Sequence, residues 1–210
     1  MESRGGLIIC GGQSRRMGQP KAWLPFGRER LLQRVVRLVA MATDVVVVVA
    51  APGQDLPDLP GSVRVVRDLV ADQGPLWGLA NGLSALPEAV DLVYASSTDV
   101  PFLQPAWVER LVALIGVDDL IIPDVGGHLH PLAALYRRKP VLNAARKLMG
   151  TGERRLVALR DAVRSRTAGA ASLADVDPSF ATLRNLNTPD DYRQALHDAG
   201  FAADQASESA

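Results

Sequence analysis

Continuously apolar runs alternate along the chain with longer segments in which apolar residues recur every three or four positions. Continuous runs are typical of strands buried on both faces of a parallel sheet, and the longer period is typical of helices packed on one. We therefore predict an α/β protein with a doubly wound, mostly parallel sheet. The predicted strands cover residues 6–10, 44–50, 63–66, 91–96, 119–123, 131–136 and 182–185.

Helical patterns fall between these strands. The last of them has the clearest start, because Thr188 can cap it and Asp190 and Asp191 follow where the helix dipole favours acids. Residues 51–62 are rich in proline and glycine and predict a surface loop, whereas residues 161–180 have too weak a pattern to predict any element. The predicted helices cover residues 28–41, 75–86, 105–115, 139–148, 153–160 and 189–198.

The composition indicates one globular domain with a small ligand. The 210 residues are 48% hydrophobic, so we expect a single domain over residues 1–200 and a flexible tail over residues 201–210. Lysine plus arginine and aspartate plus glutamate each number 23, which argues against nucleic acid or an anionic membrane as a partner. Any attraction for phosphate must therefore be local.

The lack of a recognisable signal peptide or membrane span and the cysteine usage both predict a cytoplasmic protein. The first ten residues have too little apolar length for a signal peptide, and residues 45–51 are far shorter than the ~20 residues of a membrane span. The single cysteine, Cys10, excludes an internal disulfide and fits a reducing compartment. Its thiol has no activating base nearby in sequence, which favours packing over a nucleophilic role.

A glycine-rich segment follows the first predicted strand and carries the strongest chemical signal. Glycines let backbone amides approach phosphate oxygens, and cations offset phosphate charge, so the segment predicts a polyphosphate ligand. The spacing fits neither GxxxxGK[ST] nor GxGxxG. The segment includes Cys10, Gly11, Gly12, Gln13, Ser14, Arg15, Arg16, Met17, Gly18 and, after two intervening residues, Lys21.

Acidic residues follow two other predicted strands. Ligands of open α/β sheets lie outside the carboxyl ends of the strands, where Asp68 and Asp99 are expected. An aspartate that leaves a buried strand suits Mg²⁺, which prefers one or two carboxylates with phosphate oxygens and water. Taken alone, Asp99 can equally be a turn residue, but together with the glycine-rich segment it predicts a metal ligand.

The next segment, RDLVADQGPLWGLANGL, combines Asp68 with the start of a helix. Gly74 and Pro75 mark that start, whose unpaired amides can hold a base edge or a phosphate, and Gly78 removes a side chain where a base can approach. Without the glycine-rich segment, an ordinary transition from a loop to a helix would explain these residues equally well.

Downstream polar residues leave alternatives open. His130 can donate to a substrate phosphate or to a loop, and Asn187 can join a metal site through its amide oxygen or stabilise a turn. Arg154 and Arg155 can be solvated cations or the rim of a site for an anionic second substrate.

The pattern GGxSxRMGxxK resembles the signature of sugar-nucleotide-type nucleotidyltransferases. The ordered motifs CGGQSRRMGQPK, GPLWG, STDVPF, HPLAAL, GERR and NLNTPDD resemble those of the molybdenum cofactor guanylyltransferase family. That resemblance implies a Rossmann-like nucleotidyltransferase fold and transfer of GMP from GTP to molybdopterin or molybdenum cofactor, with Mg²⁺ as cofactor and molybdoenzyme-maturation proteins as further partners. It implies nucleotide and magnesium contacts by Gly11, Gly12, Arg16, Lys21, Asp68 and Asp99.

Within the resemblance, we expect the catalytic residues to be Arg16 and Lys21 on the triphosphate and Asp99 on the metal, with Asn187 as a second metal ligand. One departure concerns the base. Pro20 before Lys21 is similar to the related cytidylyltransferases, whereas the two glycines after Cys10 favour guanine. The alternatives are a CTP-dependent or sugar-phosphate nucleotidyltransferase and a non-catalytic nucleotide-binding protein.

Overall fold

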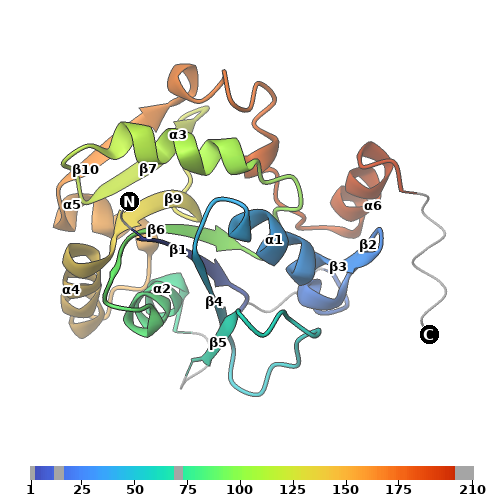
Figure 1. The fold of residues 1–210 in the computed structure, drawn as a ribbon, viewed down its shortest axis with the longest axis horizontal. Helices are drawn as coiled ribbons and strands as arrows, with labels where there is room; N and C mark the ends of the chain where they lie inside the picture. The colour runs from blue at the N-terminus through green and yellow to red at the C-terminus, as the bar shows by residue number, and fades with distance from the viewer. Residues whose placement is uncertain (1–2, 12–16, 69–72, 202–210) are drawn as a thin grey trace.

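A computed structural model gives the structure of residues 3–11, 17–68 and 73–201. Eight strands of these residues form a central sheet in the order β10-β7-β9-β6-β1-β4-β5, and β8 pairs with β7 at its side (Figure 1). The sheet strands are β1 (Ser3–Ile9), β4 (Val45–Ala50), β5 (Arg64–Arg67), β6 (Val90–Ser97), β7 (Leu120–Val125), β8 (His128–Leu129), β9 (Ala133–Arg137) and β10 (Ser165–Gly169).

Most of the sheet is parallel, as predicted. Strand β1 pairs in parallel with β4 and β6, β4 with β5, and β7 with β10. Strand β9 is antiparallel to both β6 and β7. Between β7 and β8 the chain turns at Gly126 and Gly127, whose φ values of 63° and 78° suit a two-residue hairpin loop. This turn reverses the chain ahead of β9.

Helices cover both faces of the sheet (Figure 1). Leu7 and Ile9 of β1 belong to the core with helices α2 and α4, whereas Ile8 and Cys10 belong to the core with α1 and α3. Because alternate side chains of one strand enter different cores, the strand has no polar face, which explains the continuous apolar run. The helices are α1 (Leu31–Ala40), α2 (Pro75–Ala85), α3 (Pro105–Ile115) and α4 (Arg138–Gly150).

A third apolar cluster joins the C-terminal helix α6 (Pro189–Asp198) to the small hairpin of β2 (Pro25–Phe26) and β3 (Glu29–Arg30), at the right of Figure 1. The hydroxyl of Tyr192 donates to the carbonyl oxygen of Pro25. The ring of Phe201 meets that of Phe26 edge-on, with 5.5 Å between centroids. This contact ties the last described residues to the chain just after the glycine-rich segment.

The predicted cap of α6 is confirmed, because the side chain of Thr188 accepts a hydrogen bond from the Asp191 amide at 3.1 Å. The predicted strand at residues 182–185 is wrong. The region forms the short 3-10 helix η4 (Ala181–Leu183), because the Asp177 carboxylate accepts the amide of Thr182 at 2.8 Å and so replaces a strand partner. Strand β10 was not predicted, since its side chains are mostly exposed.

The predicted helix at residues 153–160 is shorter and later than expected. The structure has 3-10 helix η2 (Leu156–Ala158) followed by α5 (Leu159–Ala162). Two further 3-10 turns are η1 (Lys21–Trp23) and η3 (Ala170–Ser172). Across the described ranges, no helix has both the length and the apolar character that crossing a membrane requires.

Gly82 lets α2 lie close to β1. A Cβ at this position would be 1.9 Å from Cδ1 of Leu7 and 3.0 Å from Cγ2 of Val49, both fully buried. We expect Gly82→Ala to lower the free energy of unfolding by about 1–3 kcal/mol, measured by chemical denaturation, because the core must shift. Gly150→Ala, where a Cβ meets no atom within 4 Å, is the control, and an equal loss there would contradict this explanation.

Candidate active site

The carboxyl ends of β1, β4, β5 and β6 lie at the same edge of the sheet. The Cys10 amide donates to the Val49 oxygen at 2.8 Å, and the Asp68 amide donates to the Ala50 oxygen at 2.9 Å. These bonds continue the strand pairing by one residue, so the backbone is fixed where the polar segments begin. Asp99 follows β6, the other neighbour of β1. The structure therefore brings the strand-end residues to one edge, as expected.

Part of the glycine-rich segment is described and part is not. Gly11 and Met17 are described, and Met17 is buried in the cluster with the C-terminal helix α6. Four of the predicted ligand contacts lie outside the described residues, and their roles stay predictions: Gly12, Gln13, Ser14 and Arg16.

Lys21, Asp99 and Asn187 meet at this edge. The Lys21 ammonium donates to Oδ2 of Asp99 at 2.6 Å and to Oδ1 of Asn187 at 3.3 Å. The side chains of Lys21 and Asp99 are only 19% and 14% exposed. The fold thus brings Asp99 and Asn187, which are 78 and 166 positions from Lys21 along the chain, to the same ammonium group.

The Asp99 carboxylate is held from both sides. Its second oxygen, Oδ1, accepts the Ser97 hydroxyl at 2.7 Å. The Asp99 carbonyl oxygen accepts the Leu186 amide at 3.0 Å, which places Asn187 beside Asp99. The side chain therefore has a defined orientation, as a metal ligand or a partner of a phosphate-binding lysine requires.

The oxygens around Lys21 also fit a divalent cation. Asp99 and Asn187 already hold a cation, and carboxylate and amide oxygens are ligands that Mg²⁺ accepts. Within the described ranges, no group of three or more His, Cys, Asp or Glu side chains could hold a metal. A metal at Asp99 would accordingly need oxygens from a bound phosphate and water to complete its shell.

Asp68 has a partner that sequence reasoning missed. Asn81 of α2 donates Nδ2 to Oδ1 of Asp68 at 2.6 Å, and both side chains are half-buried. The only signal in the sequence was an amide one turn after Gly78 in an otherwise apolar helix. Nothing local in that pattern indicates which strand end it contacts.

Gly74 and Pro75 start α2, as predicted, and Gly74 has φ of 88°. A Cβ at Gly74 would be 2.9 Å from Cβ of Arg154, and the Leu76 amide donates to the Arg154 oxygen at 3.2 Å. Gly78 faces β1, since its Cβ would be 3.3 Å from Cγ2 of Ile9. Close packing thus accounts for both glycines, and the GERR segment lies beside the helix start.

Within that segment, Glu153 organises the backbone. The Arg155 guanidinium and the amides of Arg154 and Arg155 donate to its carboxylate, and these bonds lower the pKa of Glu153 to about 2. The segment therefore keeps Arg154 next to Gly74 in a defined turn.

Two further predicted residues, His130 and Cys10, are partly or fully buried. His130 is half-buried ahead of β9, and burial lowers the pKa of its imidazole, so the neutral form is favoured at pH 7. Cys10 is buried as expected, and burial raises the pKa of its thiol while the Gln54 amide donates to Sγ at 3.4 Å. The thiol is accordingly a packing group.

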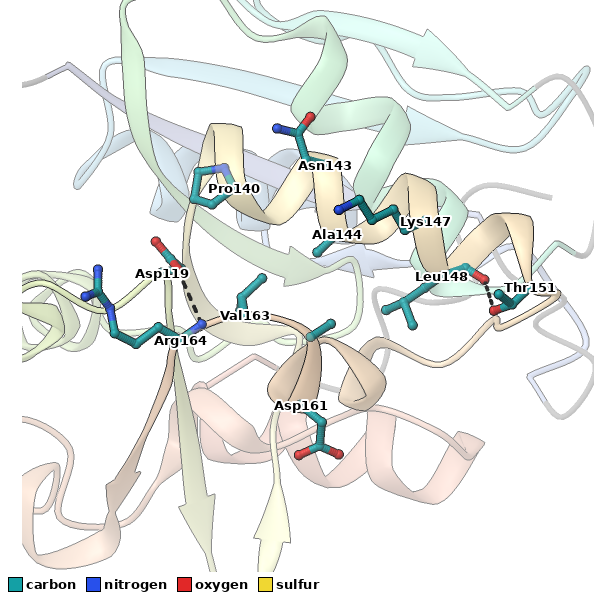
Figure 2. Close-up of a pocket in the computed structure, with 11 residues that line it drawn as sticks. Asp119, Pro140, Asn143, Ala144, Lys147, Leu148, Thr151, Asp161, Val163 and Arg164 are labelled. Atoms are coloured by element: carbon teal, nitrogen blue, oxygen red, sulfur yellow. Dashed lines mark hydrogen bonds between the residues drawn. The ribbon is translucent and has the colours of Figure 1, made fainter.

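Figure 2 shows a pocket of about 580 Å³ elsewhere on the molecule. It is bordered by Asn143 and Lys147 of α4, by Thr151 directly after that helix, and by Asp119 and Arg164, which precede β7 and β10. The pocket is therefore at the amino ends of those strands, opposite the edge that holds Lys21 and Asp99.

Comparisons with known proteins identify the family of this chain. The family model of the MobA-like NTP transferase domain matches residues 6–168. A protein of Mycobacterium avium (strain 104) named "Probable molybdenum cofactor guanylyltransferase" is 36% identical over 193 residues, which cover 90% of this chain and 92% of that protein.

Two solved structures show the same fold. Molybdopterin-guanine dinucleotide biosynthesis protein A from Archaeoglobus fulgidus has a TM-score of 0.76 at 19% identity and covers 93% of this chain and 98% of its own. The Mycobacterium tuberculosis H37Rv protein Rv0371C, in complex with manganese, has a TM-score of 0.59 at 17% identity and covers the same shares. From the length of the family match and the identity to the M. avium protein, the chain belongs to the MobA-like NTP transferase domain family and is a nucleotidyltransferase.

Proposed function

We propose that this nucleotidyltransferase transfers GMP from GTP to the terminal phosphate of molybdopterin, free or bound to molybdenum, and releases pyrophosphate. The observation that carries the proposal is the ammonium of Lys21 held by Asp99 and Asn187, at the strand edge where the glycine-rich segment begins. The identity of 36% to a protein named as a guanylyltransferase supports the choice of donor and acceptor.

The chemistry needs cations more than a base. An oxygen of the acceptor phosphate forms a bond to the α-phosphorus of GTP, and the bond from that phosphorus to the bridging oxygen of pyrophosphate breaks. Because the acceptor phosphate is already ionised, no strong base is required. The barrier arises from charge repulsion and from alignment of the two substrates.

Lys21 and Arg16 bind the triphosphate in this proposal, and Asp99 with Asn187 would hold Mg²⁺ through the oxygen lone pairs that the Lys21 ammonium leaves open. When bound, the metal neutralises phosphate charge. The Ser97 hydroxyl keeps the Asp99 carboxylate turned toward Lys21. Since the Lys21 ammonium is held before substrate arrives, its charge is preorganised, which is the condition for a large electrostatic contribution.

The nucleoside lies between the start of α2 and the ends of β1 and β5. We assign it to Gly11, Asp68, Gly74 and Pro75, with the backbone of Cys10. Gly78 stays a predicted contact, although Ile9 occupies the side on which a Cβ of Gly78 would lie. We assign the acceptor phosphate to the side of the site where Arg154 lies beside Gly74. We assign His130, as a neutral imidazole, the role of a hydrogen-bond donor to a substrate phosphate.

Protection against thermal unfolding tests the donor. GTP, CTP, ATP and UTP are each added with Mg²⁺, and we expect GTP to raise Tm most, because a specific ligand stabilises by RT ln(1 + [L]/Kd). A larger shift with CTP would favour the cytidylyltransferase reading that Pro20 suggests. Equal shifts with all four would contradict base selection.

Pyrophosphate release tests the acceptor. We expect release with GTP and molybdopterin and none with GTP and a sugar or polyol phosphate. Release with a sugar phosphate would overturn the proposed acceptor. A protein that binds GTP but releases no pyrophosphate with any acceptor would be a nucleotide-binding protein without turnover.

A further inference from the structure

Asn81 joins helix α2 to the end of strand β5. Its Nδ2 donates to Oδ1 of Asp68 at 2.6 Å, across 13 positions of sequence that include the connection between these elements. The Asp68 backbone is already fixed by its amide bond to the Ala50 oxygen. The bond from Asn81 restricts rotation of the Asp68 side chain.

We infer that Asn81 is a positioning residue for nucleotide binding: it fixes the Asp68 carboxylate so that the carboxylate accepts N–H or O–H donors of the nucleoside. The inference rests on the proposed function, since it assumes that Asp68 contacts the nucleotide. Asn81 itself acts through Asp68.

The type of donor supports this role. Asn81 is uncharged, so it orients the carboxylate without pairing its negative charge, as an arginine or lysine would. An ionised carboxylate has about four acceptor positions, and the bond from Asn81 occupies one of them. The remaining positions can accept a nucleoside donor in a hydrogen bond strengthened by charge.

The place of Asn81 on the helix also supports it. Gly78 lies one turn earlier, and residues three apart share a helix face. Gly78 packs on Ile9, next to Cys10 and the start of the glycine-rich segment. Because Asp68 directly follows β5, the Asn81–Asp68 bond lies at the carboxyl edge of the sheet, where nucleotides bind in this class of fold.

A second bond between the same two elements provides a matched control. Arg64, at the other end of β5, donates Nη1 to the carbonyl oxygen of Ala85 at the end of α2, at 2.6 Å. If the Asn81–Asp68 bond only fastened α2 to β5, removal of either bond would have the same consequences. If Asn81 positions Asp68, only its removal weakens nucleotide binding.

The experiment compares Asn81→Ala, Asp68→Ala, the double variant and Arg64→Ala by calorimetric titration with GTP and Mg²⁺. We expect Asn81→Ala to weaken GTP binding about tenfold and to raise the KM for GTP with little change in kcat. The double variant should bind like Asp68→Ala, because the two residues act as a unit. Arg64→Ala should bind like the wild type.

Asn81→Leu, which is close in volume and has no donor, repeats the measurement if the alanine variant is unfolded. The inference is overturned if the loss of the Asn81 donor leaves GTP affinity unchanged, if Asp68→Ala itself binds normally, or if the two losses add. It is also overturned if Arg64→Ala weakens binding equally. Failure of the wild type to bind any nucleotide would instead overturn the proposed function together with this inference.

Discussion

Replacing Lys21 with alanine should lower kcat about a hundredfold at saturating GTP and acceptor. Removal of one preorganised charge contact to a transition state typically costs about 3 kcal/mol, and 1.4 kcal/mol corresponds to a factor of ten. Lys21 fits that description because Asp99 and Asn187 hold its ammonium in place at 2.6 Å and 3.3 Å. Release of pyrophosphate under single-turnover conditions measures the effect on chemistry directly.

Lys147→Ala is the matched control for this variant. Lys147 lies on α4 and borders the pocket at the opposite edge of the sheet (Figure 2). We expect its kcat to equal that of the wild type. Unchanged kcat in Lys21→Ala, with a melting temperature near that of the wild type, would refute the role of Lys21 in catalysis.

Replacing Asp99 with asparagine should raise the concentration of divalent cation needed for half-maximal turnover at least tenfold and lower kcat by a hundredfold or more. The substitution keeps the shape of the side chain, so the Ser97 hydroxyl at 2.7 Å retains an oxygen acceptor. It removes the negative charge that pairs with the Lys21 ammonium at 2.6 Å. A neutral amide oxygen binds Mg²⁺ more weakly than a carboxylate does, and a metal supplies several kcal/mol of charge stabilisation.

Electron paramagnetic resonance of Mn²⁺ measures metal binding independently of turnover. We expect the complex of the Asp99→Asn protein with GTP to hold Mn²⁺ at least tenfold more weakly than that of the wild type. Asp190→Asn, which changes an exposed carboxylate on α6, controls for the loss of one negative charge. Equal Mn²⁺ affinity in Asp99→Asn and the wild type would show that the metal is held elsewhere.

Local patterns were sufficient for most of the architecture. The apolar run of β1 predicted a strand buried on both faces, and the structure confirms this because Leu7 and Ile8 enter different cores. Capping is equally local: Thr188 and Asp191 are three positions apart, so the chemistry that starts α6 is complete within one turn. Signals of this kind depend only on near neighbours, and a sequence displays them directly.

Pairing between distant segments could not be predicted in this way. The antiparallel direction of β9 follows from the hairpin at Gly126 and Gly127, and the same apolar run would suit either direction. The predicted strand at residues 182–185 failed because Asp177 takes up the amide of Thr182, a contact that hydrophobic periodicity does not report.

The same distinction between local patterns and distant contacts applies to the candidate site. The sequence by itself determined which residue types follow the strands, and therefore that a glycine-rich segment, a lysine and two aspartates belong at one edge of an α/β sheet. Only the tertiary structure decided that Lys21 meets both Asp99 and Asn187, and that Asn81 holds Asp68. The physical reason is that composition and periodicity record whether a residue is buried, whereas a hydrogen bond of 2.6 Å depends on how whole elements pack.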